Sequence, residues 1–334
     1  MGVALRTAAY RRGWLATRRL NRPVVSVGNL SLGGTGKTPF VAFLAELMMR
    51  RGWKPSVLTR GYGRRKGPDL VAIEPGSGRH PDPREVGDEP ALLARKLPEV
   101  PIIVCADRYR AGLLAEEKFG VDVHIIDDGF QHLALAREVD IVLLDVTQEL
   151  SDRALLPVGR LREPCAALGR AHFLALTRCE LAEPQPTEHR AREVNSQARI
   201  FHCITKLRGL TDVQSGVVQP LETLLGQPIQ AFCGIGNPGA FFADLAKWGL
   251  SVVAKTSFAD HYVYQTGELN RLMASARKLG AGALVATEKD ALKLPPFGKM
   301  PIPIYACVIQ TEMRETSEFD EALFERLESA RVNA

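Results

Sequence analysis

Several features are scarce or missing in this sequence, and each absence excludes a class of protein. Aromatic residues make up only 7% of the chain, which argues against binding of single-stranded nucleic acid by base stacking. The six cysteines include no CxxC pair, so the sequence indicates neither a zinc site nor a disulfide framework, and we expect a reduced cytosolic protein. No run of 18 apolar residues predicts a membrane-spanning helix, and no continuous apolar segment at the N-terminus indicates a secretory signal.

Acidic residues are missing from the start of the chain, where arginine is abundant. No Asp or Glu precedes Glu46, although the net charge of the whole chain is only +5. The arginines of this segment are Arg6, Arg11, Arg12, Arg18, Arg19 and Arg22. On a helix over residues 3–22, those from Arg11 onward fall within one arc of about 120°, mostly opposite Tyr10, Trp14 and Leu20. Such a basic segment suits an anionic partner, either phospholipid headgroups or nucleic acid. The opposed apolar face predicts a basic amphipathic helix over residues 1–22 on a membrane surface, and the alternative is a helix packed on its own domain with a solvated arginine face.

The length of 334 residues suits two α/β domains. Apolar strands are predicted at 24–30, 100–105, 121–127 and 140–145, and again at 229–233, 251–256, 283–286 and 302–308, and a strand followed by a turn is predicted at 56–63. Helices are predicted at 39–51, 90–97, 239–248, 266–279 and 319–330. The alternation predicts parallel sheets, and the polar, proline-containing stretch 183–198 is a plausible boundary region.

The strongest motif is SLGGTGKTP (Ser31–Pro39), which directly follows a predicted strand and opens a predicted helix. This is the context of a P-loop, although Ser31 stands where the standard pattern has glycine. Backbone N–H groups would surround the β-phosphate, Lys37 would bridge the β- and γ-phosphates, and the Thr38 hydroxyl would bind Mg²⁺. The predicted nucleotide-binding residues of the loop are Ser31, Leu32, Gly33, Gly34, Thr35, Gly36, Lys37 and Thr38. We therefore predict an α/β fold with a P-loop NTPase-like parallel-sheet domain over 23–200 and a smaller α/β domain over 201–334.

Two acidic motifs are candidates for the chemistry. IIDDGFQH (Ile125–His132) places Asp127 and Asp128 at the end of a buried strand, where a metal-binding acid sits in P-loop folds, with Gln131 or His132 close enough to join. An Asx turn that caps the strand is the structural alternative. GDEP (Gly87–Pro90) places Asp88 at the start of a helix, as an N-cap or as a base for an attacking hydroxyl.

The remaining motifs are weaker. FADHYVY contains Asp260 and His261 in a turn before a helix, where a lone histidine is more often structural. ATEKD (Ala286–Asp290) is similar to the TKxD signature that reads guanine in GTPases, but Glu288 stands at the lysine position. Basic turns supply Arg60, Arg108 and Arg160, which could contact phosphates.

Together these segments resemble the tetraacyldisaccharide 4′-kinase family, the lipid A 4′-kinases of Gram-negative bacteria. The motifs that carry the resemblance lie in order between residues 24 and 294: VGNLSLGGTGKTP, LTRGYGR, VGDEPALLA, ADRYRAG, IIDDGFQH, LLPVGRLREP, CGIGNPGAFF, FADHYVY and ATEKDALKL. Members of the family often begin with a longer and more apolar segment than this arginine-rich one. The difference favours a helix that lies on the membrane surface over one that spans it.

The resemblance implies a kinase bound peripherally to the cytoplasmic face of the bacterial inner membrane. It would use ATP and Mg²⁺ to phosphorylate the 4′-hydroxyl of lipid A disaccharide 1-phosphate (the tetraacyldisaccharide 1-phosphate), which yields lipid IVA, with no nucleic acid or obligatory protein partner. Asp88 would contact the attacking hydroxyl with His261 as its partner in a dyad, and the smaller domain would close the cleft. The resemblance also assigns Lys37 and Thr38 to phosphate and Mg²⁺, Arg108 and Arg160 to phosphate, and Asp127, Asp128, Gln131 and Glu89 to the metal region.

A P-loop GTPase that acts as a metal-delivery or assembly switch is the competing hypothesis. It is motivated by ATEKD (Ala286–Asp290), but it would require an intact [NT]KxD signature and, for metal delivery, a cluster of Cys and His residues. The sequence contains neither.

Overall fold

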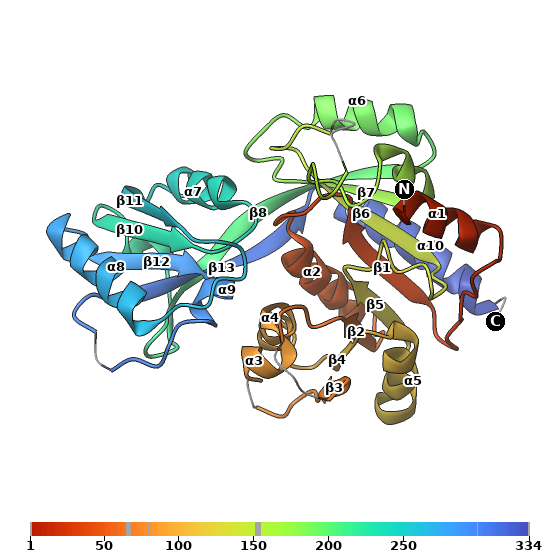
Figure 1. The fold of residues 1–334 in the computed structure, drawn as a ribbon, viewed down its shortest axis with the longest axis horizontal. Coiled ribbons are helices and arrows are strands. Elements are labelled where there is room, and N and C mark those ends of the chain that lie inside the picture. The colour runs from red at the N-terminus through yellow and green to blue at the C-terminus, as the bar shows by residue number, and fades with distance from the viewer. Residues whose placement is uncertain (1, 65–67, 79–80, 151–154, 299, 333–334) are drawn as a thin grey trace. The chain divides into compact units, whose positions relative to one another are not determined.

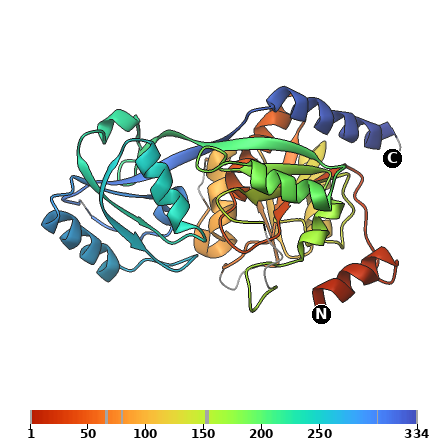
Figure 2. The same cartoon turned by 90° about the horizontal axis from the view of Figure 1, so that it is seen from above.

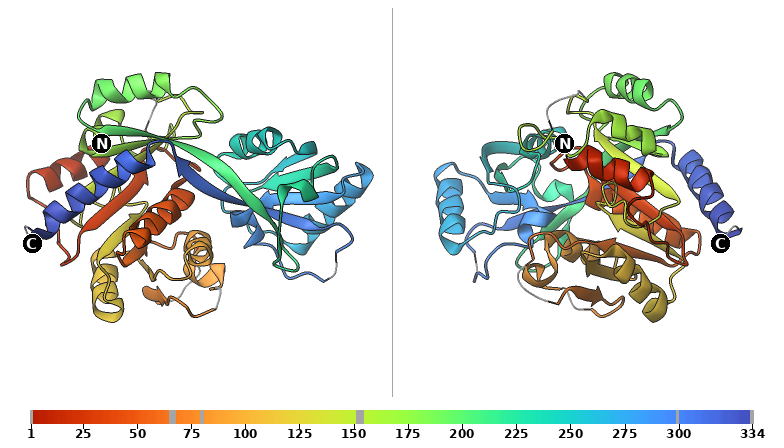
Figure 3. Two further views of the ribbon diagram at one scale, coloured as in Figure 1. Left: turned by 180° about the vertical axis from the view of Figure 1, so that it is seen from behind. Right: turned by 45° about the vertical axis from the view of Figure 1, so that its right-hand side comes forward.

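The computed structural model describes residues 2–64, 68–78, 81–150, 155–298 and 300–332, which form two compact units. The first unit contains residues 1–204 and 311–334, and the second contains residues 205–310. The chain passes between the units within two long strands, β8 (Arg199–Asp212) and β13 (Ile304–Met313) (Figures 1 and 3).

A twisted sheet forms the centre of the first unit. Across the sheet the strands are β3 (Leu70–Ile73), β4 (Ile102–Cys105), β2 (Pro55–Thr59), β5 (Val123–Asp127), β1 (Val24–Asn29), β6 (Val139–Asp145), β7 (Phe173–Thr177) and β8. Among the described pairs of this unit, β3 runs antiparallel to β4 and the others are parallel. The predicted parallel sheet is therefore confirmed. β1 lies between β5 and β6, and the carboxyl ends of these three parallel strands lie side by side.

Helices cover both faces of this sheet. They are α1 (Gly2–Arg11), α2 (Lys37–Arg50), α3 (Pro83–Val86), α4 (Asp88–Lys96), α5 (Arg108–Phe119), α6 (Gln185–Val194) and α10 (Thr316–Val332). On one face, Phe40 of α2 packs against Phe319 of α10 with ring centroids 6.3 Å apart. α10 and α1 lie on opposite sides of the sheet (Figure 2).

The domain boundary differs from the predicted one in two ways. Residues 183–198 include the helix α6, which buries Thr187 and Ala191, and the chain leaves the first unit only after Ile204. The last part of the predicted second domain, residues 311–334, belongs to the first unit. The reason is packing, because α10 buries Phe319, Leu323 and Leu327 in the same core as α2.

The N-terminal helix is also shorter than predicted. α1 ends at Arg11, not at residue 22, because Gly13 adopts a left-handed conformation (φ 71°) and the Trp14 N–H donates to the Ala9 carbonyl over 2.9 Å. This arrangement is typical of a glycine-terminated helix. Beyond this end the exposed Trp14 places its ring 5.1 Å from the Arg12 guanidinium carbon.

Residues 17–22 form a non-helical segment that packs against the first unit. The Arg18 N–H donates to the Ala134 carbonyl over 2.9 Å, and the Leu20 side chain is buried. Arg18 pairs with Asp107 at 3.2 Å, and Arg19 pairs with Glu138. Two of the six arginines at the start of the chain are thus used in ion pairs within the protein. No described helix is both long enough and apolar enough to cross a membrane.

The second unit is a smaller α/β unit. Its parallel strands are β11 (Ser251–Ser257), β10 (Pro228–Cys233), β12 (Ala283–Thr287) and β13, and the short β9 (Val218–Gln219) pairs antiparallel with β8. Its helices are α7 (Pro238–Lys247), α8 (Thr266–Lys278) and α9 (Glu288–Ala291). The helices predicted at 239–248 and 266–279 are confirmed as α7 and α8.

Gly28 on β1 has no room for a side chain. A Cβ atom there would lie 2.6 Å from the Phe130 Cβ and 2.8 Å from the Phe130 backbone nitrogen. We expect Gly28→Ala to lower the free energy of unfolding by about 1–3 kcal/mol, as overpacking does in other cores. Urea denaturation measures the loss. Gly169→Ala is the matched control, because no heavy atom lies within 4 Å of its Cβ position. Equal midpoints for the two variants would contradict the prediction.

Candidate active site

The predicted phosphate loop lies between β1 and α2. β1 ends at Asn29 and α2 begins at Lys37, so the expected strand–loop–helix context is confirmed. Gly36 precedes the helix in a left-handed conformation (φ 85°), and no side chain caps the helix there. The first N–H groups of α2 are therefore available to an anion, as a phosphate site requires.

Asn29 organises this loop, and sequence reasoning missed it. Its buried side-chain amide donates to the Ser31 carbonyl over 2.8 Å and to Thr35 Oγ1 over 3.0 Å. Its Oδ1 accepts a hydrogen bond from Lys37 Nζ over 3.2 Å. One buried amide thus fixes the beginning of the loop and the direction of the Lys37 side chain.

Neighbouring segments hold the loop from outside. Thr177, at the end of β7, donates through Oγ1 to the Thr35 carbonyl over 3.0 Å, and Arg178 donates to the Gly34 carbonyl over 3.1 Å. Arg160 donates through Nη2 to the Leu32 carbonyl over 3.1 Å, while its own carbonyl accepts from the Leu32 N–H over 2.8 Å. Arg160 therefore lies on the loop, and its contact with phosphate stays a prediction.

The two aspartates of IIDDGFQH lie beside the loop, because β5 pairs directly with β1. Asp127 is buried and accepts a hydrogen bond from Thr59 Oγ1 over 3.1 Å. Burial, together with the negative charges of Glu89 and Asp128, raises the pKa of Asp127 to about 7. Glu89, which the family resemblance assigned to the metal region, is therefore close enough to Asp127 to influence its ionisation.

Asp128 forms an ion-pair bridge between two cations. Its carboxylate lies 3.4 Å from Lys37 Nζ and 2.6 Å from Arg162 Nη1. Burial opposes its ionisation, but Lys37 and Arg162 outweigh burial and hold the pKa of Asp128 below its ordinary value. The residue has a positive φ of 53°, a conformation that side chains rarely adopt outside functional sites and turns. Arg162 stands two residues after Arg160 and was not predicted.

The side-chain oxygens of Asp127, Asp128 and Gln131 are suitable ligands for Mg²⁺. Gln131 donates its amide N–H to the Asn29 carbonyl and to Glu163, both over 3.0 Å. Its Oε1 is a buried atom without a hydrogen-bond partner among the described residues, and the buried Oδ1 of Asp128 lies 3.4 Å from Lys37 Nζ. No group of three His, Cys, Asp or Glu side chains in the described chain forms a complete metal site. Mg²⁺ commonly binds through one or two carboxylates, with phosphate and water as its other ligands, so the oxygens near Asp127 and Asp128 suit it.

Arg108 is a buried cation next to these acids. It stands in the first turn of α5, whose N-cap is Asp107, and its Nη1 donates to the Cys105 and Ala106 carbonyls over 3.2 and 3.0 Å. Burial lowers the pKa of Arg108, whereas the charge of Asp127 acts in the opposite direction. Arg108 is therefore close enough to Asp127 to feel its charge, and its contact with phosphate stays a prediction.

Asp88 is the first residue of α4 and is buried. The prediction that it is the N-cap of this helix is wrong. Gly87 occupies the cap position with φ 98°, and a Cβ atom there would lie 2.9 Å from the Tyr62 carbonyl oxygen. Asp88 Oδ1 accepts the N–H of Glu89 over 3.0 Å. The glycine therefore makes the tight turn, and the aspartate follows it within the helix.

His261 lies in the second unit, in the connection between β11 and α8. Like Asp128, it has a positive φ (60°), and its Nε2 lies 3.3 Å from Lys289 Nζ. Lys289 in turn lies 3.6 Å from Asp260. Because Asp88 and His261 belong to different units, their pairing stays a prediction.

The ATEKD motif has a structural function in the second unit. Asp290 is fully buried and accepts hydrogen bonds from the Tyr264 hydroxyl (2.9 Å), the Gly234 N–H (3.0 Å) and Thr287 Oγ1 (2.6 Å). Its carboxylate thereby fixes the loop that carries His261 to the end of β12. Because the Asp290 carboxylate is buried in these hydrogen bonds, it is not available to bind a guanine base.

A phosphate-binding loop between a central strand and a helix, with a buried and a half-buried aspartate at the end of the neighbouring strand, defines a P-loop nucleotide-binding protein. Comparison with known proteins is more specific. The family model for tetraacyldisaccharide-1-P 4′-kinase matches residues 1–328, and the chain belongs to this family.

Individual relatives agree with this assignment. The tetraacyldisaccharide 4′-kinase of Geobacter metallireducens is 42% identical over 97% of this chain and 94% of its own length. That of Koribacter versatilis is 41% identical over 94% of this chain and 92% of its own length. A crystal structure of the "apo" form of LpxK from Aquifex aeolicus in complex with ATP has 32% identity and a TM-score of 0.76, and covers 97% of this chain and 95% of that one. The expected family is confirmed, and the GTPase-switch alternative finds no support.

The arrangement around Asn29 gives a prediction for catalysis. We expect Asn29→Ala to lower kcat/KM for ATP about 10²-fold, because a misplaced Lys37 loses the geometry that phosphoryl transfer requires. Asn195→Ala is the matched control. Asn195 is also buried and donates to the Leu168 and Ala171 carbonyls, away from the loop. We expect both variants to lose stability and only Asn29→Ala to lose kcat/KM in steady-state assays. Equal kinetic losses would contradict the positioning role.

Proposed function

We propose that this protein transfers the γ-phosphate of ATP to the 4′-hydroxyl of tetraacyldisaccharide 1-phosphate and so forms lipid IVA. The main support is the phosphate loop of a chain that belongs to this kinase family, with Lys37 directed across it by Asn29 and Asp128. Lys37 would bind the β- and γ-phosphates, and Arg162, Arg108 and Arg160 supply further positive charge around the transferred group. Mg²⁺ held by Thr38 and by oxygens of Asp127, Asp128, Gln131 or Glu89 would neutralise charge on the phosphoryl oxygens.

Asp88 is the proposed acceptor of the proton from the 4′-hydroxyl. Its support is a buried carboxylate at the start of α4, next to Glu89, whose charge influences Asp127. His261 is the proposed partner that tunes its basicity, which requires the second unit to close on the first during the reaction. In a loose transition state the proton leaves late, so we expect Asp88 to orient the hydroxyl and then to accept its proton.

Acceptor chemistry tests the proposal directly. Label from γ-³²P-ATP should appear in tetraacyldisaccharide 1-phosphate and not in a 4′-deoxy analogue of it. Failure to label the natural acceptor, with nucleotide hydrolysis intact, would overturn the proposed function. Equal labelling of both lipids would overturn the proposed position of transfer.

We also propose that the protein binds peripherally to the anionic cytoplasmic face of the inner membrane through the end of α1. Arg11 and Arg12 are exposed there beside Trp14, which is 71% exposed, and this combination of residues is typical of a helix at a membrane interface. Arg18 and Arg19 are less suited to lipid, because Asp107 and Glu138 pair with them.

Flotation with vesicles that contain anionic phospholipid tests this surface. We expect the double variant Arg11→Glu/Arg12→Glu to lose most of its vesicle binding, because each basic residue contributes about 1 kcal/mol at such a surface. The control is Arg277→Glu/Lys278→Glu on α8, an equal change of charge at exposed residues. Binding that survives the first change, or that is lost equally with the second, would contradict the assignment.

A further inference from the structure

Lys289, the lysine of the ATEKD motif, lies directly beside His261. The two residues come from separate segments of the second unit, because Lys289 stands in α9 and His261 in the connection between β11 and α8. Lys289 Nζ lies 3.3 Å from His261 Nε2 and 3.6 Å from Asp260 Oδ1. The lysine side chain is only 15% exposed, so water competes little for these contacts. A largely buried cation is thus placed at one ring nitrogen of the proposed dyad histidine.

The turn that carries His261 is held in place beside Lys289. Asp290, which follows Lys289, accepts a hydrogen bond from the Tyr264 hydroxyl over 2.9 Å. Tyr264 packs against Tyr262, the residue after His261, with ring centroids 5.3 Å apart. His261 itself has a positive φ of 60°, a strained conformation that persists only where the surrounding structure fixes it. The contact between the lysine and the histidine therefore belongs to a well-fixed part of the fold.

The chemistry of the two groups decides which ring nitrogen of His261 carries the proton. An ammonium group has three N–H donors and no acceptor, so His261 Nε2 accepts the hydrogen bond from Lys289. Asp260 Oδ1 lies 3.9 Å from the same nitrogen, too far to accept a hydrogen bond from it. A ring with a proton on each nitrogen would direct Nε2–H at the N–H groups of Lys289. The contact therefore selects the neutral tautomer with its proton on Nδ1.

This tautomer determines what His261 can offer to the proposed base. An ionised carboxylate only accepts hydrogen bonds, so the partner of Asp88 in the dyad has to donate one. With Nε2 occupied as an acceptor, Nδ1–H is the donor of the ring. The other tautomer would present a lone pair at Nδ1, which repels a carboxylate. In the Ser–His–Asp triad of serine proteases, loss of the group that fixes the histidine tautomer lowers kcat about 10⁴-fold.

We propose that Lys289 is a positioning residue of the kinase reaction, which holds His261 in the tautomer with its proton on Nδ1. The inference rests on the proposed function, because it takes His261 as the partner of Asp88. In this role Lys289 transfers no proton. Its ammonium group donates to Nε2, and the Nδ1–H group donates to the carboxylate that receives the proton of the 4′-hydroxyl. Asp260 holds the ammonium group from the other side.

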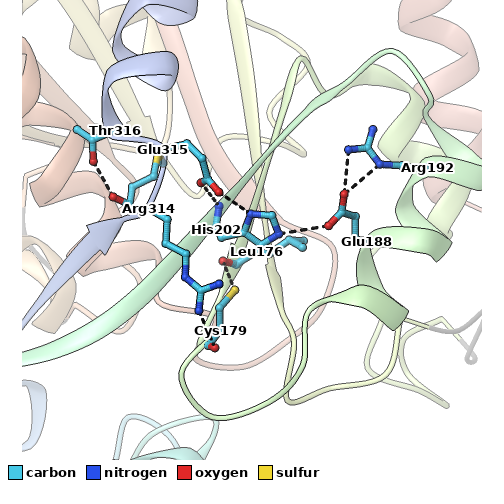
Figure 4. A network of polar contacts seen from close by, with 9 residues as sticks. Leu176, Cys179, Glu188, Arg192, His202, Arg314, Glu315 and Thr316 are labelled. Carbon is cyan, nitrogen blue, oxygen red and sulfur yellow. Dashed lines mark hydrogen bonds and ion pairs between the residues drawn. The ribbon is translucent and has the colours of Figure 1, made fainter.

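Two histidines of the first unit are internal references for a spectroscopic test. His172 Nδ1 accepts the backbone N–H of Asp140 over 2.9 Å, and burial lowers the pKa of His172, so this ring is neutral with its proton on Nε2. His202 lies between two carboxylates, Glu315 at 2.9 Å from Nδ1 and Glu188 at 3.2 Å from Nε2 (Figure 4). Because carboxylates only accept, this environment suits a proton on each nitrogen. The two rings therefore represent the two states that the inference excludes for His261.

The first measurement is ¹⁵N NMR of the whole protein, labelled at the histidine ring nitrogens. The His261→Gln variant identifies the signals of His261 by their absence. We expect a protonated Nδ1 and an unprotonated Nε2 in His261, the reverse of His172. Lys289→Met keeps the length of the side chain and removes the ammonium group, so the preference for Nδ1–H should be lost. Lys289→Arg keeps N–H donors at this position and should retain the preference.

Kinetics connect the tautomer to the reaction. We expect Lys289→Met to lower kcat for lipid phosphorylation about 10- to 100-fold, the usual effect of losing a group that orients a functional histidine in metalloenzymes. Calorimetric ATP affinity should not change, because Lys289 belongs to the second unit and not to the phosphate loop. Lys289→Arg should recover most of the lost rate. Lys278→Met is the matched control, because it removes the same charge at an exposed position of α8 and should leave both spectrum and kcat unchanged.

Three results would overturn the inference. They are a wild-type His261 with its proton on Nε2, a tautomer that survives in Lys289→Met, and a changed tautomer with an unchanged kcat. Wild-type protein that does not phosphorylate the lipid would overturn the proposed function and the kinetic role of Lys289, whereas the spectrum would still decide the tautomer. Thermal unfolding shows whether the variants fold, and the wild-type spectrum and Lys289→Arg decide the question if Lys289→Met does not.

Discussion

Replacing Asp88 with asparagine is expected to slow lipid phosphorylation about 10²- to 10⁴-fold, the usual contribution of a positioned general base. The carboxamide keeps the size and the hydrogen-bonding capacity of the side chain, but it cannot accept the proton of the 4′-hydroxyl. ATP affinity should stay near that of the wild type, because Asp88 belongs to α4 and not to the phosphate loop. Single-turnover transfer of ³²P to the lipid, together with calorimetric ATP binding, measures both quantities.

The matched control for this change is Asp82→Asn. Asp82 also stands at the start of a short helix, where it caps α3 by accepting the N–H of Arg84 over 2.8 Å. Asparagine is an equally good cap, so activity should not change. Near-normal transfer by the Asp88→Asn variant would show that the base lies elsewhere and would remove the support for a dyad with His261.

Replacing Lys37 with methionine is expected to lower kcat at least about 10²- to 10³-fold, the scale of losing one charge-stabilising group in an active site. Methionine keeps the length of the side chain and removes the ammonium group that Asn29 and Asp128 direct across the loop. Tripolyphosphate binding should weaken as well, because Lys37 belongs to the phosphate loop. Steady-state kinetics and calorimetry provide the two measurements.

Two controls accompany this prediction. Lys54→Met removes the same charge at an exposed position just before β2 and should be silent. Lys37→Arg keeps the charge, but its planar fork cannot replace a compact ammonium group, so we expect only partial activity. A Lys37→Met variant that transfers phosphate at the wild-type rate would rule out the proposed function of the loop.

The central part of the site could be predicted from the sequence because its signals are local. The sequence SLGGTGKTP carries its own turn geometry and helix start, and the two aspartates follow a strand whose apolar pattern is unmistakable. Their proximity follows from the parallel sheet, in which β5 lies next to β1. The GDEP motif left Asp88 open as an N-cap or as a base, and the family resemblance chose the base and supplied His261 as its partner.

The parts that could not be predicted depend on contacts between distant segments. In the sequence, Asn29 is indistinguishable from the last residue of an ordinary strand. Only the folded loop brings its side-chain amide to Lys37 and Thr35. Arg162 gains its importance from Asp128, which lies 34 residues earlier in the chain. No local pattern distinguishes either residue from a surface polar group.

The predictions for the N-terminal helix and for the domain of the C-terminal helix were wrong for the same reason, because both depend on contacts between distant segments. The arginine periodicity of residues 3–22 fits a helix, but Gly13 stops it, and the partners of Arg18 and Arg19 are Asp107 and Glu138. The helix at the C-terminus was correctly predicted, yet its amphipathic pattern did not reveal which sheet it covers. Packing against Phe40 and Phe173 of the first unit settles that question.

The central claim is that the loop and Asp88 together phosphorylate a lipid hydroxyl. The most direct measurement is transfer of label from γ-³²P-ATP to tetraacyldisaccharide 1-phosphate, with the wild type and Asp88→Asn assayed side by side and γ-³²P-GTP as the second donor. The account predicts labelled lipid with the wild type and ATP, and loss of that label in the variant at unchanged ATP affinity. No labelled lipid from the wild type, with GTP hydrolysed in preference to ATP, would contradict it.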